Sequence, residues 1–169
     1  FLPFPGLFRW LLDSLRIPMS NFSSGPADQP PLTAAGQKIG VSVCYEDAFG
    51  EEIIRALPEA TLLVNVSEDA WFGNSLAPHQ RIQMARLRAL EAGRPMLRAA
   101  NTGPSVVIRH DGEVIARSPQ FEAYVLRATV EPRQGATPYS RWGNSLAVWL
   151  LCGLLAAGFL VARREPVSR

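Results

Sequence analysis

Residues 38–44 read KIGVSVC, and this stretch decides the fold. Its β-branched residues alternate with small or polar ones, and a period of two is typical of a β-strand. Acidic residues crowd the positions that follow, and aliphatic residues come next, before Pro58. Negative side chains are favoured at the positive N-terminal end of a helix. The sequence therefore predicts a strand that ends at Cys44 and a short helix directly after it.

Two further strands and a helix follow this first unit. Residues 62–66 are more continuously apolar, which is typical of a strand buried on both faces. Residues 78–92 carry apolar side chains at helical spacing and end before Gly93, a favoured C-cap. Residues 96–100 are predicted as a third strand. This alternation predicts a layered α/β domain with helices packed on a mostly buried sheet.

A hairpin and a last strand are expected after these units. Residues 106–108 and 114–116 flank HDGE at 110–113, in which Asp-Gly favours a tight turn. Residues 124–130 are predicted as a last strand. Residues 131–140 are predicted as a linker that leads to the C-terminal segment.

The composition excludes several classes of protein. A length of 169 residues suggests about one domain. The formal net charge is only +2, so binding of nucleic acid through charge is not expected. The two cysteines and two histidines lie far apart and match neither a disulfide scaffold nor a structural zinc site. The sequence indicates no metal and no organic cofactor.

The C-terminal region carries an uncharged apolar run. Residues 146–162 read LAVWLLCGLLAAGFLVA, with tryptophans near the start and Arg163-Arg164 after the end. Such a run with aromatic and basic anchors predicts a transmembrane helix at about 145–162. The basic tail indicates that the C-terminus lies in the cytoplasm and that residues 1–140 lie on the opposite side of the membrane. The alternative is a helix buried in a soluble core.

The chain opens with Phe1 and not with methionine, so we expect its numbering to start inside a longer gene product. Residues 1–12 are apolar, but prolines and a glycine interrupt them, and they lack the basic start of a signal peptide. We expect this segment to rest on the membrane interface.

Cys44 is the candidate nucleophile. A sharp turn from strand to helix can expose a nucleophile above a sheet, and a helix N-terminus favours the thiolate. The backbone N–H of Tyr45 would point at a developing oxyanion. Glu46 would orient a neighbouring group or move a proton. The alternative is a small buried hydrophobic residue, as most free cysteines are. The other cysteine, Cys152, falls in the predicted span and cannot pair with Cys44.

A cysteine nucleophile also needs a base, and the sequence shows no obvious one. His79 lies near a helix start, and His110 falls in the predicted turn, where a solvated side chain is expected. Lys38 shares the strand of Cys44 but would lie ~20 Å away at ~3.3 Å per residue. Either Cys44 is structural, or its catalytic partners precede Phe1.

Five ordered segments together resemble a known family. They read GVSVCYEDAFGE (40–51), LLVNVSEDAWFGNSLAPHQ (62–80), MARLRALEAGRPMLRAANTG (84–103), DGEVIA (111–116) and TPYSRWGN (137–144), ahead of the apolar run. They are similar to the apolipoprotein N-acyltransferases of the nitrilase (carbon–nitrogen hydrolase) superfamily. The resemblance implies an α/β fold, a nitrilase-like α-β-β-α sandwich followed by one C-terminal transmembrane helix. Residues 1–140 would be the C-terminal part of a periplasmic catalytic domain. Residues 141–169 would hold the helix and a short cytoplasmic basic tail in the bacterial inner membrane.

The resemblance also implies an acyltransferase that matures bacterial lipoproteins. The Cys44 thiolate would attack an acyl ester of a phospholipid donor, and a thioester would form. The amine of the N-terminal diacylglyceryl-cysteine of an apolipoprotein would then take the acyl group. This superfamily uses a Glu-Lys-Cys triad, of which only the Cys is matched here. The Glu and Lys would precede Phe1, so the chain alone is expected to be inactive.

Further site residues follow from the resemblance. Tyr45 and Glu46 match a Cys-Tyr-Glu motif, which implies active-site roles, against a packed aromatic and a helix-start acid as alternatives. Trp71 and Phe72 would bind the substrate by lining an acyl-chain pocket, with ordinary core packing as the alternative. Glu68 stands where the family more often has Asn, so a direct role is not assigned to it.

An arginine-rich set surrounds the second predicted helix. Its members could meet phosphate headgroups, but we favour a structural role, with a solvated face and one or two ion pairs. The set comprises Arg81, Arg86, Arg88, Arg94 and Arg98.

Two rival functions remain open at this stage. A membrane-anchored amidase or nitrilase would share the cysteine chemistry but transfer the acyl group of a small amide to water. A non-catalytic nitrilase-like scaffold would keep the fold without the triad.

Overall fold

The computed structural model describes residues 25, 26 and 28–164, with side chains up to residue 160. The predictions for residues 1–12 and for the last residues of the basic tail lie outside this part of the chain.

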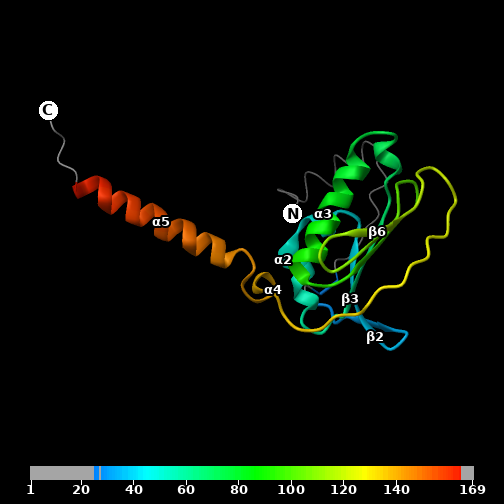
Figure 1. The fold of residues 1–169 in the computed structure, drawn as a ribbon, viewed down its shortest axis with the longest axis horizontal. Helices are drawn as coiled ribbons and strands as arrows, with labels where there is room; N and C mark the ends of the chain where they lie inside the picture. Colours follow the sequence, from blue (N-terminus) through cyan, green and yellow to red (C-terminus); the bar gives the residue numbers. More distant parts are fainter. Residues whose placement is uncertain (1–24, 27, 165–169) are drawn as a thin grey trace, which may run out of the picture.

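The centre of the fold is one mixed six-stranded sheet (Figure 1). Its strands follow the sequence order β1 to β6 across the sheet. The pairs β2–β3 and β3–β4 are parallel, and the other neighbours are antiparallel. The strands are β1 Leu32–Ala34, β2 Gln37–Val43, β3 Leu62–Ser67, β4 Met96–Ala100, β5 Val106–Ile108 and β6 Val114–Arg117. The predicted α/β class and these strands, except the short β1, are therefore confirmed.

The predicted strand at 124–130 is wrong. These residues adopt neither helix nor strand, and Val125 is 76% exposed. A segment rich in aromatic and β-branched residues forms a strand only where the edge of a neighbouring strand pairs with it. Residues 118–137 instead form one long connection without regular structure.

The helices include one long helix on the sheet and several short turns. The predicted single helix after Cys44 is instead three short pieces, and the predicted helix at 78–92 is confirmed as α3. Gly93 ends α3 with φ 61°, as expected of a C-cap. The helical elements are η1 Cys44–Ala48, α2 Gly50–Ile53, η2 Ile54–Ala56, η3 Ala70–Phe72, α3 Ala77–Ala92, α4 Pro138–Trp142 and α5 Ser145–Arg164.

The hydrophobic core lies between α3 and one face of the sheet. Ala85, Ala89 and Ala92 are fully buried there, beside Met96 and Val106. Small alanine side chains let the helix approach the strands closely, so that larger aliphatic residues of β4 and β5 fill the space. This packing fixes the position of the first turn of α3 over the carboxyl end of β2 and β3.

The opposite face of the sheet is apolar, and the described residues leave its centre exposed. Val41 pairs with Val64, and Val43 pairs with Val66, in the parallel ladder. Val41, Val43 and Val66 are 46%, 54% and 43% exposed. The described residues therefore form one sheet with helices packed on one face.

The helix α5 extends away from the sheet (Figure 1). Its large side chains are exposed along the described length, among them Trp149 at 75% and Leu155 at 73%. Over the part of the chain that the structure describes, no helix combines the length and hydropathy needed to cross a membrane. The transmembrane helix predicted at 145–162 is therefore not confirmed, although a helix does form there.

Candidate active site

Cys44 occupies a sharp turn at the carboxyl end of β2. It is the first residue of η1, and its backbone adopts φ 51°, the left-handed region that non-glycine residues rarely enter. Such a conformation costs about 1–3 kcal/mol and persists only where surrounding contacts impose it. The predicted sharp turn at Cys44 is therefore present and strained, and Cys44 itself is half-buried.

Asn65 holds this turn in place from the neighbouring strand. Its side chain is fully buried, and its Nδ2 donates to the Cys44 carbonyl at 3.0 Å and to Ser42 Oγ at 3.0 Å. The parallel register places Asn65 beside Ser42, so the amide reaches past the end of β2. A buried amide that satisfies the carbonyl of a strained residue favours that conformation.

Replacing Asn65 with Ala is expected to destabilise the protein by about 1–3 kcal/mol, because the Cys44 carbonyl and the Ser42 hydroxyl lose a buried partner. The matched control is Asn74→Ala, since Asn74 is an exposed asparagine in the loop before α3. Urea unfolding of the purified protein measures both losses. Equal losses for the two variants would show that Asn65 does not support the turn.

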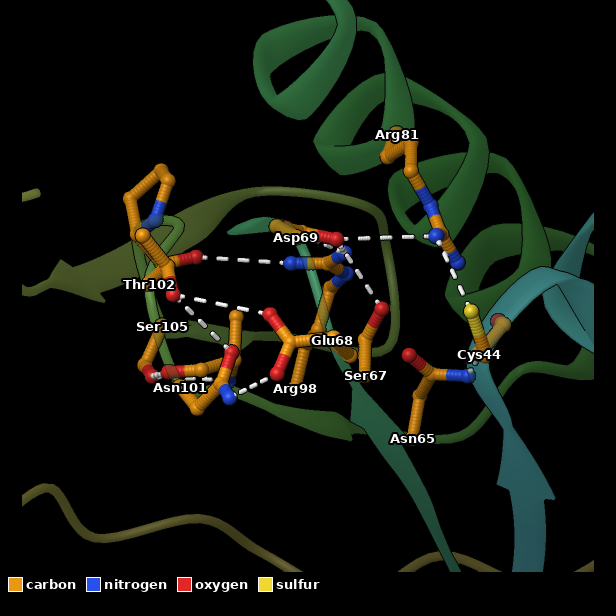
Figure 2. A network of polar contacts seen from close by, with 12 residues as sticks. Cys44, Asn65, Ser67, Glu68, Asp69, Arg81, Arg98, Asn101, Thr102 and Ser105 are labelled. Carbon is orange, nitrogen blue, oxygen red and sulfur yellow. Dashed lines mark hydrogen bonds and ion pairs between the residues drawn. The ribbon is translucent and has the colours of Figure 1, made fainter. Parts of the chain in front are cut away.

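The sulfur of Cys44 faces the guanidinium of Arg81. Arg81 Nη1, from the first turns of α3, donates to Cys44 Sγ at 3.5 Å (Figure 2). This contact lowers the pKa of the Cys44 thiol below its usual value, against an opposing effect of burial. The nearby Ser67 and Glu68 also lower this pKa. The site therefore favours a thiolate, the nucleophilic form of cysteine.

A buried ion-pair cluster lies behind Arg81. Asp69 is the link between two arginines, because its carboxylate accepts from Arg98 Nη2 at 2.9 and 3.1 Å and from Arg81 at 3.5 Å (Figure 2). Asp47 accepts from Arg81 Nη2 at 3.4 Å. All four side chains are at most 5% exposed.

The two residues after Cys44 have structural contacts of their own. The Tyr45 ring is 56% exposed, lies edge-on to Phe49, and has Arg81 Cζ 5.9 Å from its centroid. Glu46 accepts from the backbone N–H of Val43 at 2.6 Å, which ties the turn to the strand before it. These contacts leave the predicted oxyanion role of the Tyr45 N–H and the supporting role of Glu46 as predictions.

The two aromatic residues predicted to bind an acyl chain lie on η3, in the loop that follows β3. Trp71 is 87% exposed and Phe72 is 40% exposed, so ordinary core packing is wrong for Trp71. Glu68, two residues before η3, accepts from the backbone N–H of Ala70 at 2.6 Å and from Asn101. Glu68 therefore shapes the loop that carries both aromatics.

The other candidate bases contact different partners. His79 Nδ1 lies 2.7 Å from Arg117 Nη2 on β6. Lys38 lies at the opposite end of β2, where its carbonyl accepts from Thr61 N–H at 2.8 Å. In the described residues, no group of three or more His, Cys, Asp or Glu side chains could hold a metal ion.

The arginine set divides into two groups. Arg94 is 1% exposed and donates to backbone carbonyls, including those of Ala60 at 2.6 Å and Gly135 at 2.7 Å. Arg86 donates to the Gly112 carbonyl at 2.7 Å. These contacts fit the structural role that we favoured. Arg81 differs, because it also contacts Cys44.

Sequence reasoning missed Asn65, and it placed Arg81 in the arginine set without linking it to Cys44. Arg81 precedes the buried Ala85 and Ala89 by one and two helical turns, so it lies on the buried side of α3. An arginine on a buried helix face needs anionic partners, and that was the available signal. Asn65 interrupts an apolar strand, which is the corresponding signal for a buried polar contact.

Comparison with known proteins identifies the family of this chain. Residues 15–139 match the model of the carbon-nitrogen hydrolase family. An apolipoprotein N-acyltransferase of Nitrosomonas europaea is 51% identical over 96% of this chain and 33% of its own length. One of Chromobacterium violaceum is 52% identical over 92% of this chain and 30% of its own. The chain thus spans about a third of the length of the curated relatives it matches.

A solved structure shows the same fold at low sequence identity. The crystal structure of a carbon-nitrogen hydrolase from Helicobacter pylori G27 matches with a TM-score of 0.56 and 20% identity, over 65% of this chain and 45% of that one. At this identity, the likeness concerns the fold alone. The family match covers most of the chain, including Cys44 and the sheet around it. The chain belongs to the carbon–nitrogen hydrolase family.

Proposed function

We propose that this chain is the C-terminal part of an apolipoprotein N-acyltransferase with Cys44 as its nucleophile. The observation that carries the proposal is the strained turn that presents the Cys44 sulfur to Arg81 at 3.5 Å. The name shared by relatives at 51% and 52% identity supports the choice of substrate class. The donor is a phospholipid, and the acceptor is a diacylated apolipoprotein.

The reaction proceeds in two acyl transfers. The Cys44 thiolate attacks the carbonyl carbon of a phospholipid acyl ester, a C–S bond forms, and the C–O bond breaks. The departing oxygen takes a proton and leaves as lysophospholipid. The α-amine of the apolipoprotein then attacks the thioester, a C–N bond forms, the C–S bond breaks, and the amine loses a proton. The Tyr45 N–H stabilises the oxyanion of both steps. Glu46 holds the turn that carries Cys44 through its hydrogen bond from the Val43 N–H.

The proton transfers require groups that Cys44 lacks among the described residues. The side chains that approach its sulfur are Arg81 and Ser67. Arginine keeps its proton at neutral pH, so it cannot act as the base. We assign the acid–base work to a Glu and a Lys of the longer protein, and expect the 169 residues alone to be inactive.

The uncovered sheet face supports the same conclusion. An apolar face such as that of Val41, Val43 and Val66 needs a packed layer to exclude water. We propose that a second sheet from the longer protein covers it, which completes a nitrilase-like α-β-β-α sandwich. Residues 1–140 then belong to the catalytic domain, and residues 141–169 form a separate segment.

A lipid environment is proposed for α5. Its exposed side chains include Leu150, Leu154 and Leu160, and a helix that is apolar on all sides needs apolar surroundings. We place α5 in the bacterial inner membrane, with the catalytic domain periplasmic and the basic tail cytoplasmic. Trp71 and Phe72 then offer exposed apolar area to the acyl chain of the donor.

The test is detection of the acyl-enzyme. The full-length protein in detergent is mixed with phosphatidylethanolamine without an acceptor, digested at mild pH, and the peptide with Cys44 is weighed. We expect an added acyl mass that hydroxylamine removes and that is absent in Cys44→Ser. The peptide with Cys152 is the internal control and should stay unmodified.

Two other outcomes would each select a different function. An unmodified Cys44 in folded, lipid-exposed protein that does hydrolyse a small amide would favour a membrane-anchored amidase. An unmodified Cys44 without either activity would favour a non-catalytic scaffold.

A further inference from the structure

The cluster behind Cys44 contains as many positive as negative charges. Arg81 and Arg98 face Asp47 and Asp69, and the side chains of all four are at most 5% exposed. The cluster is therefore neutral when Cys44 is a thiol. A Cys44 thiolate adds a fifth charge beside the cluster, and the cluster residue that contacts it is Arg81.

The two arginines are engaged to different degrees. Arg98 Nη2 contacts both oxygens of Asp69 at 2.9 and 3.1 Å, a close charge-assisted contact. Every contact of Arg81 with a carboxylate is longer, at 3.4 Å to Asp47 and 3.5 Å to Asp69. Arg98 thus neutralises most of the charge of Asp69, and the charge of Arg81 stays available to Cys44.

The carboxylates also fix where the Arg81 guanidinium lies. Asp47 contacts Nη2, and Asp69 contacts Nη1, so the planar group is held from two sides. Nη1 is the atom that also reaches Cys44 Sγ. Tyr45, the residue after the nucleophile, places its ring 5.9 Å from Arg81 Cζ. A cation held over a ring and between carboxylates keeps one geometry.

We propose that Arg81 is a catalytic residue that keeps Cys44 as a thiolate, with Asp47 and Asp69 as positioning residues that hold its guanidinium against the sulfur. The inference rests on the proposed function, because it assigns the nucleophile's charge state within the same site. It separates two tasks: Arg81 stabilises the thiolate, and the acid–base groups of the longer protein move protons.

Other charged groups around η1 do not replace Arg81 at the sulfur. Those whose contacts are described point their charges elsewhere: Arg98 to Asp69, Glu46 to the Val43 N–H, Glu68 to Asn101, and Glu51 of α2 to the Asn144 N–H. Removal of Arg81 should therefore leave Cys44 facing a net negative cluster, which disfavours the thiolate.

The test is the pH profile of Cys44 alkylation in the full-length protein. Brief iodoacetamide treatment across pH values is followed by digestion, and the peptides with Cys44 and Cys152 are quantified separately. The Cys44 midpoint is expected below the value of ~8.5 for an ordinary cysteine. Arg81→Gln should raise it by about one pH unit or more, since an opposite charge at this distance shifts a pKa by that much.

Three comparisons make the result specific. Arg81→Lys should restore part of the shift, because it keeps the charge without the fork. Arg86→Gln removes a charge from the same helix and should leave the Cys44 midpoint unchanged. A folded Arg81→Gln protein with the wild-type midpoint would overturn the proposal and leave Arg81 as a purely structural ion-pair partner.

A second variant covers an Arg81→Gln protein that does not fold. Asp47→Asn removes one of the two carboxylates that hold the Arg81 guanidinium against the sulfur, so the Cys44 midpoint should rise; an equal or lower midpoint would overturn the proposal. Alkylation requires neither phospholipid nor acceptor amine. An Arg81-dependent midpoint in a protein without acyl transfer would therefore uphold this inference and overturn only the proposed function.

Discussion

The 169 residues expressed alone should transfer acyl groups at less than about one-hundredth of the rate of the full-length protein, since a positioned base contributes about 10²–10⁴-fold. Among the described residues, Arg81 supplies a positive charge and a hydrogen bond to the Cys44 sulfur but cannot act as a base. In the part of the chain that the structure describes, the apolar face around Val41 and Val43 also remains exposed, without a second layer over it. Both features predict that the isolated chain contains the nucleophile but lacks the base and the packing layer that catalysis requires.

The measurement compares the isolated chain with the full-length protein, using phosphatidylethanolamine and a diacylated peptide. Circular dichroism establishes that the isolated chain is folded before the comparison. Co-expression with the remainder of the protein should restore transfer. Transfer by the folded chain alone at a rate near that of the full-length protein would show that the 169 residues hold a complete catalytic apparatus.

Replacing Asp69 with Asn is expected to destabilise the protein by about 3–5 kcal/mol, the usual loss when one partner of a buried ion pair is removed. Asp69 is 1% exposed and contacts Arg98 at 2.9 Å, Arg81 at 3.5 Å and Ser67 Oγ at 3.0 Å. Without the carboxylate, the buried Arg98 guanidinium keeps its charge but loses its closest anion.

The matched control is Asp111→Asn in the β5–β6 turn. Asp111 also pairs with an arginine, Arg109, but their side chains are 40% and 48% exposed, so water and salt screen the pair and little change is expected. Urea unfolding measures both variants, and Asp69→Asn combined with Arg98→Met should recover part of the loss. Similar small losses for both aspartates would show that the buried cluster does not stabilise the fold.

The predictions that succeeded depend on short stretches of sequence. The alternation in β2, the helical spacing in α3 and the Asp-Gly turn before Glu113 each specify a local conformation. The turn closes as expected, with Gly112 N–H donating to the Arg109 carbonyl at 2.9 Å. The local pattern suffices here because the turn and the helix are formed by hydrogen bonds between residues a few positions apart, and the strand shows in its alternation of side chains.

The predictions that failed required partners that a local pattern does not contain. Residues 124–130 have the residue types of a strand, but no sheet edge pairs with them. The segment after Cys44 has the acids of a helix start, yet the strained turn and the contact of α3 with Asp47 divide it into η1, α2 and η2. In both cases, tertiary contacts override local preference.

The sequence by itself determined the order of β2 to β6 and α3, the place of Cys44 at the end of a strand, and the family to which its motifs belong. Only the tertiary structure decided what surrounds the sulfur. Arg81 lies 37 positions after Cys44, and Asn65 lies 21 positions after it. The parallel register of β2 with β3 and the packing of α3 bring them to one sheet edge. Such contacts depend on how distant segments pack, and no spacing along the chain records that packing.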